Sequence, residues 1–247
     1  MAPMGSESSQ PPGWVVEALE GAAGRRERPD LVLPRTGGPA GNTRLTGWLG
    51  LVLLALFAAE GVTLLSVRHL LGWHIVLGAL AIGPVALKLI STGWRMVAYY
   101  ARVPRYRVAG PPPMVYRLLG PLVVLTSVAV LLTGVLLLLI GDQRSREALF
   151  SLAGVRVDWL FLHQASFFVW FAVMTIHVLG RTVPAFKTAR RSVHEPRAVD
   201  GLALRLVSVM LALAVGAGLA VWLVGKEGGW PHRQDRVEGL SAGPARG

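Results

Sequence analysis

Histidine and lysine side chains interrupt two of the chain's longest apolar stretches, and they recur there at the same spacing. His74 and Lys88 are fourteen residues apart in one stretch, and His163 and His177 are fourteen apart in a later one. Fourteen residues make almost four helical turns, so both members of a pair share one helix face, about 21 Å apart along the axis. A neutral imidazole is the commonest axial ligand of b-type haem iron. The spacing therefore predicts two ligand levels, one near each membrane surface.

The helix face that continues from His163 carries bulky and charged groups between and beyond its two imidazoles. Steps of +4, +7, +11, +14 and +18 from that residue give Phe167, Trp170, Met174, His177 and Arg181. We expect the bulky side chains, Trp170 above all, to fill the space between the two levels. Arg181 lies at the inner edge, where a guanidinium can pair with a haem propionate.

The corresponding face of the earlier stretch is lined by smaller residues. The same steps from His74 give Gly78, Ala81, Val85, Lys88 and Thr92, and Arg95 follows at +21. A residue as small as Gly78 lets a flat macrocycle approach the helix backbone. We expect Arg95 to pair with haem propionates near the inner membrane surface, and Arg68 or Arg156 near the outer one.

The two levels differ in the ligands that they offer. His74 and His163 form the outer pair, whereas the inner pair combines His177 with Lys88. A lysine ligates iron only when its amine is deprotonated. In the alternative interpretation Lys88 snorkels to the inner interface or pairs with a propionate, and the inner haem is then absent or held by His177 with another group. A lone intramembrane histidine is most often an interhelical contact, but three histidines at matched depths favour haem.

Glu60 is the one acidic residue of the first long apolar stretch, and its depth is close to that of His74. Two interpretations remain open. It is either a proton-accepting or quinone-facing acid near the outer level, or a hydrogen-bonded glutamate between helices. The remaining histidines are expected to be ordinary polar groups, namely His69, His194 and His232.

These residues need elements that cross a membrane, and the composition predicts such elements. Of the 247 residues, 53% are hydrophobic and 16% are charged, and the mean hydropathy is +0.51. Such values are typical of a polytopic membrane protein. A helix of about 20 apolar residues crosses a hydrocarbon core of about 30 Å, and five stretches reach that length. They cover residues 45–67, 70–100, 115–140, 158–182 and 202–225.

The predicted fold is all-α: a four-helix haem-binding transmembrane bundle plus a fifth transmembrane helix, within residues 44–225. Residues 1–43 are predicted to be a largely disordered cytoplasmic tail with one short interfacial helix, and residues 226–247 a disordered C-terminal tail. Basic residues concentrate in the connections after the second and fourth stretches. The positive-inside rule therefore predicts a cytoplasmic N-terminus and a C-terminus outside.

The composition also excludes several kinds of centre and partner. The chain has no cysteine, which removes disulfides, thiolate ligands, iron–sulfur clusters and thioether-linked haem. A metal centre must then use His, Lys, Met or carboxylate groups. A formal charge of +11 would suggest nucleic acid in a soluble protein. Here the arginines lie at the ends of apolar stretches, as topology signals do, so no nucleic-acid partner is expected.

Two strings are the most distinctive in the chain. They read His74-x3-Gly78-x5-Pro84-x3-Lys88-Leu89 and His163-x6-Trp170-x6-His177. Together they resemble the helical b-type cytochrome membrane domains of bacteria, in particular the transmembrane cytochrome b-like module found alone or joined to sulfite-oxidase-type molybdopterin oxidoreductases. More distantly they are similar to ferric-reductase-like proteins and to the cytochrome b subunits of formate dehydrogenase and hydrogenase. The resemblance covers residues 45–182 and departs from the usual two-histidine ladder at Lys88.

This resemblance implies non-covalent haem b, one or two per chain, and transmembrane electron transfer. It also implies exchange of electrons with a quinone or with an extracytoplasmic redox partner. That partner would be a separate protein chain, for example a molybdopterin-type oxidoreductase. We expect an electron-transfer subunit in the cytoplasmic membrane of a prokaryote rather than a stand-alone enzyme. The alternatives are a cofactor-free membrane scaffold or small transporter, and a single-haem quinone-linked reductase.

Overall fold

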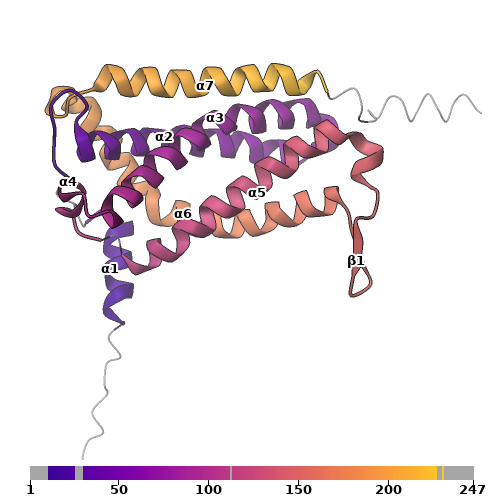
Figure 1. Ribbon diagram of the computed structural model, residues 1–247, viewed down its shortest axis with the longest axis horizontal. Coiled ribbons are helices and arrows are strands. Elements are labelled where there is room, and N and C mark those ends of the chain that lie inside the picture. Colours follow the sequence, from indigo (N-terminus) through magenta and orange to yellow (C-terminus); the bar gives the residue numbers. More distant parts are fainter. Residues whose placement is uncertain (1–10, 26–29, 112, 227–229, 231–247) are drawn as a thin grey trace, which may run out of the picture.

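The structure, a computed structural model, describes residues 11–25, 30–111, 113–226 and 230. Within this part the chain is helical apart from one two-stranded hairpin (Figure 1). The short elements are α1 (Gly13–Ala22), α4 (Pro104–Arg107), the 3-10 turn Pro196–Ala198, and the antiparallel strands β1 (Phe150–Leu152) and β2 (Val155–Val157). The long helices are α2 (Gly38–Leu64), α3 (Val67–Tyr100), α5 (Met114–Ser145), α6 (Trp159–His194) and α7 (Leu202–Val224).

The five long helices confirm the five predicted spans. They contain 23 to 36 residues, and each is long and apolar enough to cross a membrane. By length and hydropathy the chain is therefore a multi-pass membrane protein whose surroundings are a lipid bilayer.

Two of these helices extend by seven or more residues beyond the predicted spans. α2 begins at Gly38 rather than at 45, and α6 continues to His194 rather than ending at 182. In the added part of α6 the side chain of Thr188 lies close to α2, since a Cβ on Gly47 would be 3.1 Å from its methyl group. A run of apolar residues indicates only the part of a helix that lies in lipid. It therefore did not reveal the more polar turns at the start of α2 and the end of α6, which pack against other parts of the protein.

Two backbone breaks coincide with predicted span boundaries. Leu70, where the second span was predicted to begin, has non-helical dihedral angles (φ −113°, ψ 20°). Gly141 follows the predicted end of the third span and has φ 80°. A positive φ of this kind is accessible to glycine at little cost, which explains the residue type at this bend.

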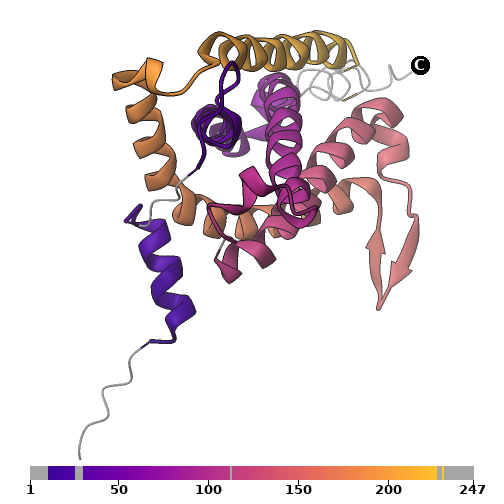
Figure 2. The ribbon, with the colours of Figure 1, turned by 60° about the vertical axis from the view of Figure 1, so that its left-hand side comes forward.

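The long helices run between two ends of the molecule. The hairpin end holds the α2–α3 turn (Leu65 and Ser66) and the β1–β2 hairpin, whereas the α4 end holds α1, α4 and the 3-10 turn (Figures 1 and 2). α6 starts at the hairpin end after Asp158, whose carboxylate accepts a hydrogen bond from the Phe161 N–H at 2.8 Å. This N-cap determines where the helix that carries His163 begins.

Four of the long helices form the body of the bundle, and the fifth covers one side of it. α2 packs against α3 and α6, and α5 packs against α6. α7 packs mainly against α3 and lies on the side away from α5 and α6 (Figure 1). The structure thus confirms an all-α fold with five long apolar helices, of which α7 packs mainly against α3.

Small residues allow α3 and α7 to approach each other closely. A Cβ on Gly83 would lie 1.9 Å from the Ala212 carbonyl oxygen, and one on Gly216 would lie 2.3 Å from the Leu80 carbonyl oxygen. Pro84 has no N–H, so the Leu80 carbonyl lacks its helical hydrogen-bond donor and stays available to the neighbouring helix. Close backbone contact through small residues is a common mode of helix association in membranes.

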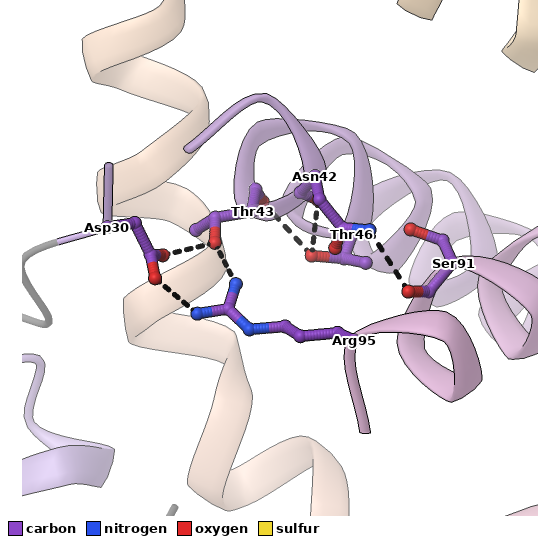
Figure 3. A network of polar contacts seen from close by, with 6 residues as sticks. All are labelled: Asp30, Asn42, Thr43, Thr46, Ser91 and Arg95. Carbon is purple, nitrogen blue, oxygen red and sulfur yellow. Dashed lines mark hydrogen bonds and ion pairs between the residues drawn. The ribbon is translucent and has the colours of Figure 1, made fainter. Parts of the chain in front are cut away.

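The segment before α2 is attached to the α4 end of α3. Arg95 forms an ion pair with Asp30 and also donates a hydrogen bond to the Thr43 hydroxyl (Figure 3). Beside it the Asn42 amide donates to the Ser91 carbonyl oxygen at 3.0 Å.

The tails predicted on either side of the membrane domain are described only in part. In the N-terminal one, residues 11–25 contain the helix α1, which is packed against α6, and residues 30–43 include Asp30 and the start of α2. Residues 1–10, 26–29 and 231–247, with His232 among them, lie outside the described part of the chain.

Candidate functional site

The structure brings His74 of α3 and His163 of α6 together near the hairpin end. Their ring centroids are 6.4 Å apart, and their planes cross at 77°. Both side chains are half-buried. This is the outer pair that the sequence predicted, and the two helices run in the same direction, as that prediction required.

Thr133 of α5 determines which nitrogen of His163 is free. Its hydroxyl donates to the Ala129 carbonyl oxygen at 2.7 Å, so its single proton is already engaged. The same oxygen lies 3.0 Å from Nδ1 of His163. With the hydroxyl proton donated along α5, this oxygen can accept from an Nδ1–H of His163, and that tautomer leaves Nε2 with the lone pair that a metal needs.

His74 has the same arrangement on the opposite side of the centre. The Thr63 hydroxyl donates to the Glu60 carbonyl oxygen at 2.6 Å, and its oxygen lies 3.2 Å from Nδ1 of His74. A carboxylate oxygen of Glu60 lies 2.8 Å from the same nitrogen. Both oxygens can accept from one Nδ1–H of His74, and in that tautomer its Nε2 is free as well.

The spacing of the two rings fits an iron atom between them. Two metal–imidazole bonds of about 2.0 Å each, together with the distance from each nitrogen to its ring centre, give a centroid separation of about 6 Å. A neutral imidazole whose second nitrogen donates a hydrogen bond is the usual state of a metal-bound histidine. The donor set at His74 and His163 therefore fits a haem with two axial histidines.

A bare metal ion fits the centre less well than a haem does. The described residues contain no group of three or more His, Cys, Asp or Glu side chains able to hold a metal ion. A porphyrin supplies four of the iron's six ligands, so two histidines are sufficient for haem but not for an unassisted ion.

Two glycines lie against the groups of this centre. A Cβ on Gly134 would be 3.2 Å from Cε1 of His163, and one on Gly78 would be 3.4 Å from the Glu60 carboxylate. Gly78 was expected to let a flat macrocycle approach the helix backbone, and in this structure the Glu60 side chain lies against it.

The sequence interpretation missed Thr63, Thr133 and Gly134. A signal was present for two of them, because Thr133 and Gly134 interrupt the otherwise apolar run from 128 to 140. Thr63 lay close to Glu60 in the chain but had no feature that marked it as a partner of a histidine.

Trp170 lies between the two predicted levels, as expected. Its indole N–H donates to the Ser127 hydroxyl at 3.1 Å, and its ring meets Phe57 edge-on at a centroid distance of 4.9 Å. It also lies beside Phe167 at 6.2 Å. The residue thus links α2, α5 and α6 in the middle of the bundle.

The inner level holds Lys88 on α3, and His177 and Arg181 on α6. The Lys88 amine donates to the Thr46 carbonyl oxygen of α2 at 2.9 Å, and a Cβ on Gly50 would be 3.2 Å from it. This contact is a hydrogen bond between α3 and α2, and it differs from both the predicted ligation and the alternative of a lysine that snorkels or pairs with a propionate. The inner pair therefore has no counterpart to the hydrogen-bonded imidazole pair at the outer level.

Three of the arginines considered as partners of haem propionates have other partners here. Arg95 is engaged by Asp30 and Thr43, which belong to a segment that the sequence analysis assigned to the tail (Figure 3). Arg181 lies over the ring of Tyr116, 5.4 Å from its centroid. At the hairpin end Arg156 donates to the Arg146 carbonyl oxygen.

Fold and site together define a multi-pass helical membrane protein with a two-histidine centre near one end of its bundle. No family model, no curated protein and no solved structure matches the chain. What the centre does is therefore argued from its geometry.

Proposed function

We propose that the chain is a membrane-integral b-type cytochrome in which His74 and His163 hold a haem. The observation that carries the proposal is the pair of imidazoles 6.4 Å apart, each with Nδ1 within hydrogen-bond distance of a side-chain oxygen. Polar contacts between helices need no such matched tautomers, whereas two free Nε2 atoms suit one iron.

The residues of the chain would bind, orient and surround the cofactor. Thr63, Glu60 and Thr133 hold the two rings in one tautomer, and the apolar surfaces of α3 and α6 exclude water from the bundle. Haem supplies a one-electron couple when it is bound. Trp170 and its aromatic neighbours fill the volume between the centre and the inner level.

The physiological role in this proposal is electron relay in the cytoplasmic membrane of a prokaryote. Electrons pass between a quinone or a cytoplasmic-side partner and a separate extracytoplasmic redox protein. The hairpin end faces outward, because the basic connections after α3 and α6 lie at the α4 end and favour the cytoplasm.

A reduced-minus-oxidised absorbance spectrum of the purified protein tests the proposal. Sharp visible haem bands are expected for the wild type, with loss of most haem in His74→Ala and in His163→Ala. His69→Ala and His194→Ala are matched controls from outside the centre and should retain the wild-type spectrum. A wild-type protein without haem bands would instead favour a cofactor-free scaffold or small transporter.

Haem content tests the inner level separately. Because the Lys88 amine is hydrogen-bonded to the Thr46 carbonyl, we expect Lys88→Ala to retain the wild-type ratio of haem to protein. The ratio is measured by a pyridine haemochrome assay against protein concentration. Loss of half the haem in Lys88→Ala and in His177→Ala would instead assign a second haem to this pair.

A further inference from the structure

The two imidazoles of the centre differ in the acceptor that each one uses. Nδ1 of His163 donates to a neutral hydroxyl, that of Thr133, at 3.0 Å. Nδ1 of His74 has the Glu60 carboxylate at 2.8 Å in addition to the Thr63 hydroxyl at 3.2 Å. The centre is therefore asymmetric, with a carboxylate on the α3 side only.

The Glu60 carboxylate is held in place for this contact. Its second oxygen is buried and has no hydrogen-bond partner within the described part of the chain. Its first oxygen would be 3.4 Å from a Cβ on Gly78, so the group packs against α3 one turn after His74. The neighbouring Thr63 hydroxyl proton is bound to the Glu60 backbone carbonyl and cannot satisfy the carboxylate.

A carboxylate acceptor changes the chemistry of the imidazole to which it is bonded. Hydrogen bonds to a carboxylate are shorter and stronger than those to a neutral oxygen. A carboxylate on the outer nitrogen also raises the basicity of the nitrogen that faces the metal. A more basic axial ligand favours the ferric over the ferrous state and so lowers the reduction potential.

We propose that Glu60 is a positioning residue that makes His74 the stronger of the two axial donors and lowers the midpoint potential of the centre. Glu60 touches neither iron nor electron partner and acts through His74. The proposal rests on the function proposed above, because it needs a haem held by His74 and His163. It develops the second interpretation of Glu60, a hydrogen-bonded glutamate between helices, because Glu60 of α2 contacts His74 of α3.

Glu60→Gln tests this role, because it retains the shape of the side chain and removes its charge. The readout is the midpoint potential in an optical redox titration of the purified full-length protein. A tenfold change in the ratio of ferric to ferrous affinity corresponds to about 59 mV for a one-electron couple, and we expect an upward shift of this order. Ferric EPR g-values should change with it, because the donor strength of one ligand has changed.

Two variants serve as controls. Glu147→Gln removes one negative charge from the link between α5 and β1, and its potential should remain that of the wild type. Thr133→Val removes the neutral acceptor on the α6 side and should shift the potential less than Glu60→Gln does. Glu60→Asp keeps the carboxylate on a shorter side chain and should restore part of the difference.

The outcomes separate this inference from the function on which it depends. A wild type without haem, or one that keeps its haem in His74→Ala, overturns the proposed function. A haem-loaded Glu60→Gln protein with the potential and g-values of the wild type overturns the role of Glu60 alone. Should Glu60→Gln not retain haem, Glu60→Ala, which also removes the carboxylate, is titrated in its place, and an unchanged potential there leads to the same conclusion.

Discussion

Thr63 and Thr133 donate their hydroxyl protons along their own helices, and this leaves their oxygens as acceptors for the histidines. The acceptors of those protons are the Glu60 and Ala129 carbonyl oxygens. A threonine side chain bonded in this way is locked in orientation, so the imidazole that it contacts is locked as well. At the residue scale, the centre therefore depends on groups that do not themselves contact a cofactor.

Thr133→Val should weaken haem binding while preserving the shape of the side chain. Loss of a hydrogen bond to a metal-bound histidine typically costs about 10- to 100-fold in affinity, and we expect a loss in this range. The rate of haem transfer to an excess of apomyoglobin measures it. Thr126→Val is the matched control, because Thr126 makes the same bond to its own helix, at Leu122, at 2.7 Å. Equal haem retention in both variants would contradict the role given to Thr133.

The pairing of the two histidines could be predicted from the sequence, whereas their hydrogen-bond acceptors could not. His74 and His163 were predicted as a pair, because residues at equal depth in parallel helices follow from spacing and topology. Their acceptors were not predicted as such, because the rotation of α2 and α5 about their axes decides which hydroxyl meets a ring. Arg95 illustrates the same limit, since its partner Asp30 reaches it only through the path of the chain before α2.

At the element scale, α7 supports α3 along the stretch between the two levels. The contact depends on glycine, because a Cβ on Gly216 would be 2.3 Å from the Leu80 carbonyl oxygen. That carbonyl lacks its helical donor as a result of Pro84. α7 thus packs at the weakest point of the helix that carries His74 and Lys88, and its expected effect is to hold that helix in shape.

Gly216→Ala should destabilise the protein by about 1–3 kcal/mol, the usual range for an overpacked contact. The measurement is the thermal unfolding midpoint in detergent. Gly218→Ala on the same helix is the control, since a Cβ there has nothing within 4 Å. The control should be neutral or gain up to about 1 kcal/mol from the better helix propensity of alanine. An unaltered midpoint in Gly216→Ala would mean that α3 and α7 are not packed this closely.

At the scale of the whole molecule, the positions of the two ends determine which membrane surface lies near the histidine centre. The α4 end carries the basic connections, whereas the hairpin end carries β1, β2 and the short α2–α3 turn. From the positive-inside rule we expect the centre to lie toward the exterior. In the proposed function, an electron partner on that side would meet the hairpin end first.

Cysteine labelling measures this orientation directly, because the chain has no cysteine of its own. Ser151→Cys places a thiol in the exposed hairpin, and Ala101→Cys places one in the exposed turn at the end of α3. A membrane-impermeant maleimide should label the first variant in intact spheroplasts and the second only after lysis. The reverse pattern would place the histidine centre at the cytoplasmic surface.

The sequence by itself determined the number and order of the membrane-crossing helices. It also determined the depth of His74, Lys88, His163 and His177 along them. Both follow from local quantities, the length of an apolar run and the rise of a helix per residue. The positions of the backbone breaks at Leu70 and Gly141 coincide with the boundaries of those apolar runs.

Only the tertiary structure decided which oxygens accept from the imidazoles and which amines and guanidiniums are engaged elsewhere. Glu60 meets His74, Lys88 meets Thr46, and Arg95 meets Asp30. These contacts depend on helix rotation, on the close approach of neighbouring backbones and on the return of a distant segment. None of these is a property of a single helix, so no pattern within one stretch of sequence contains them.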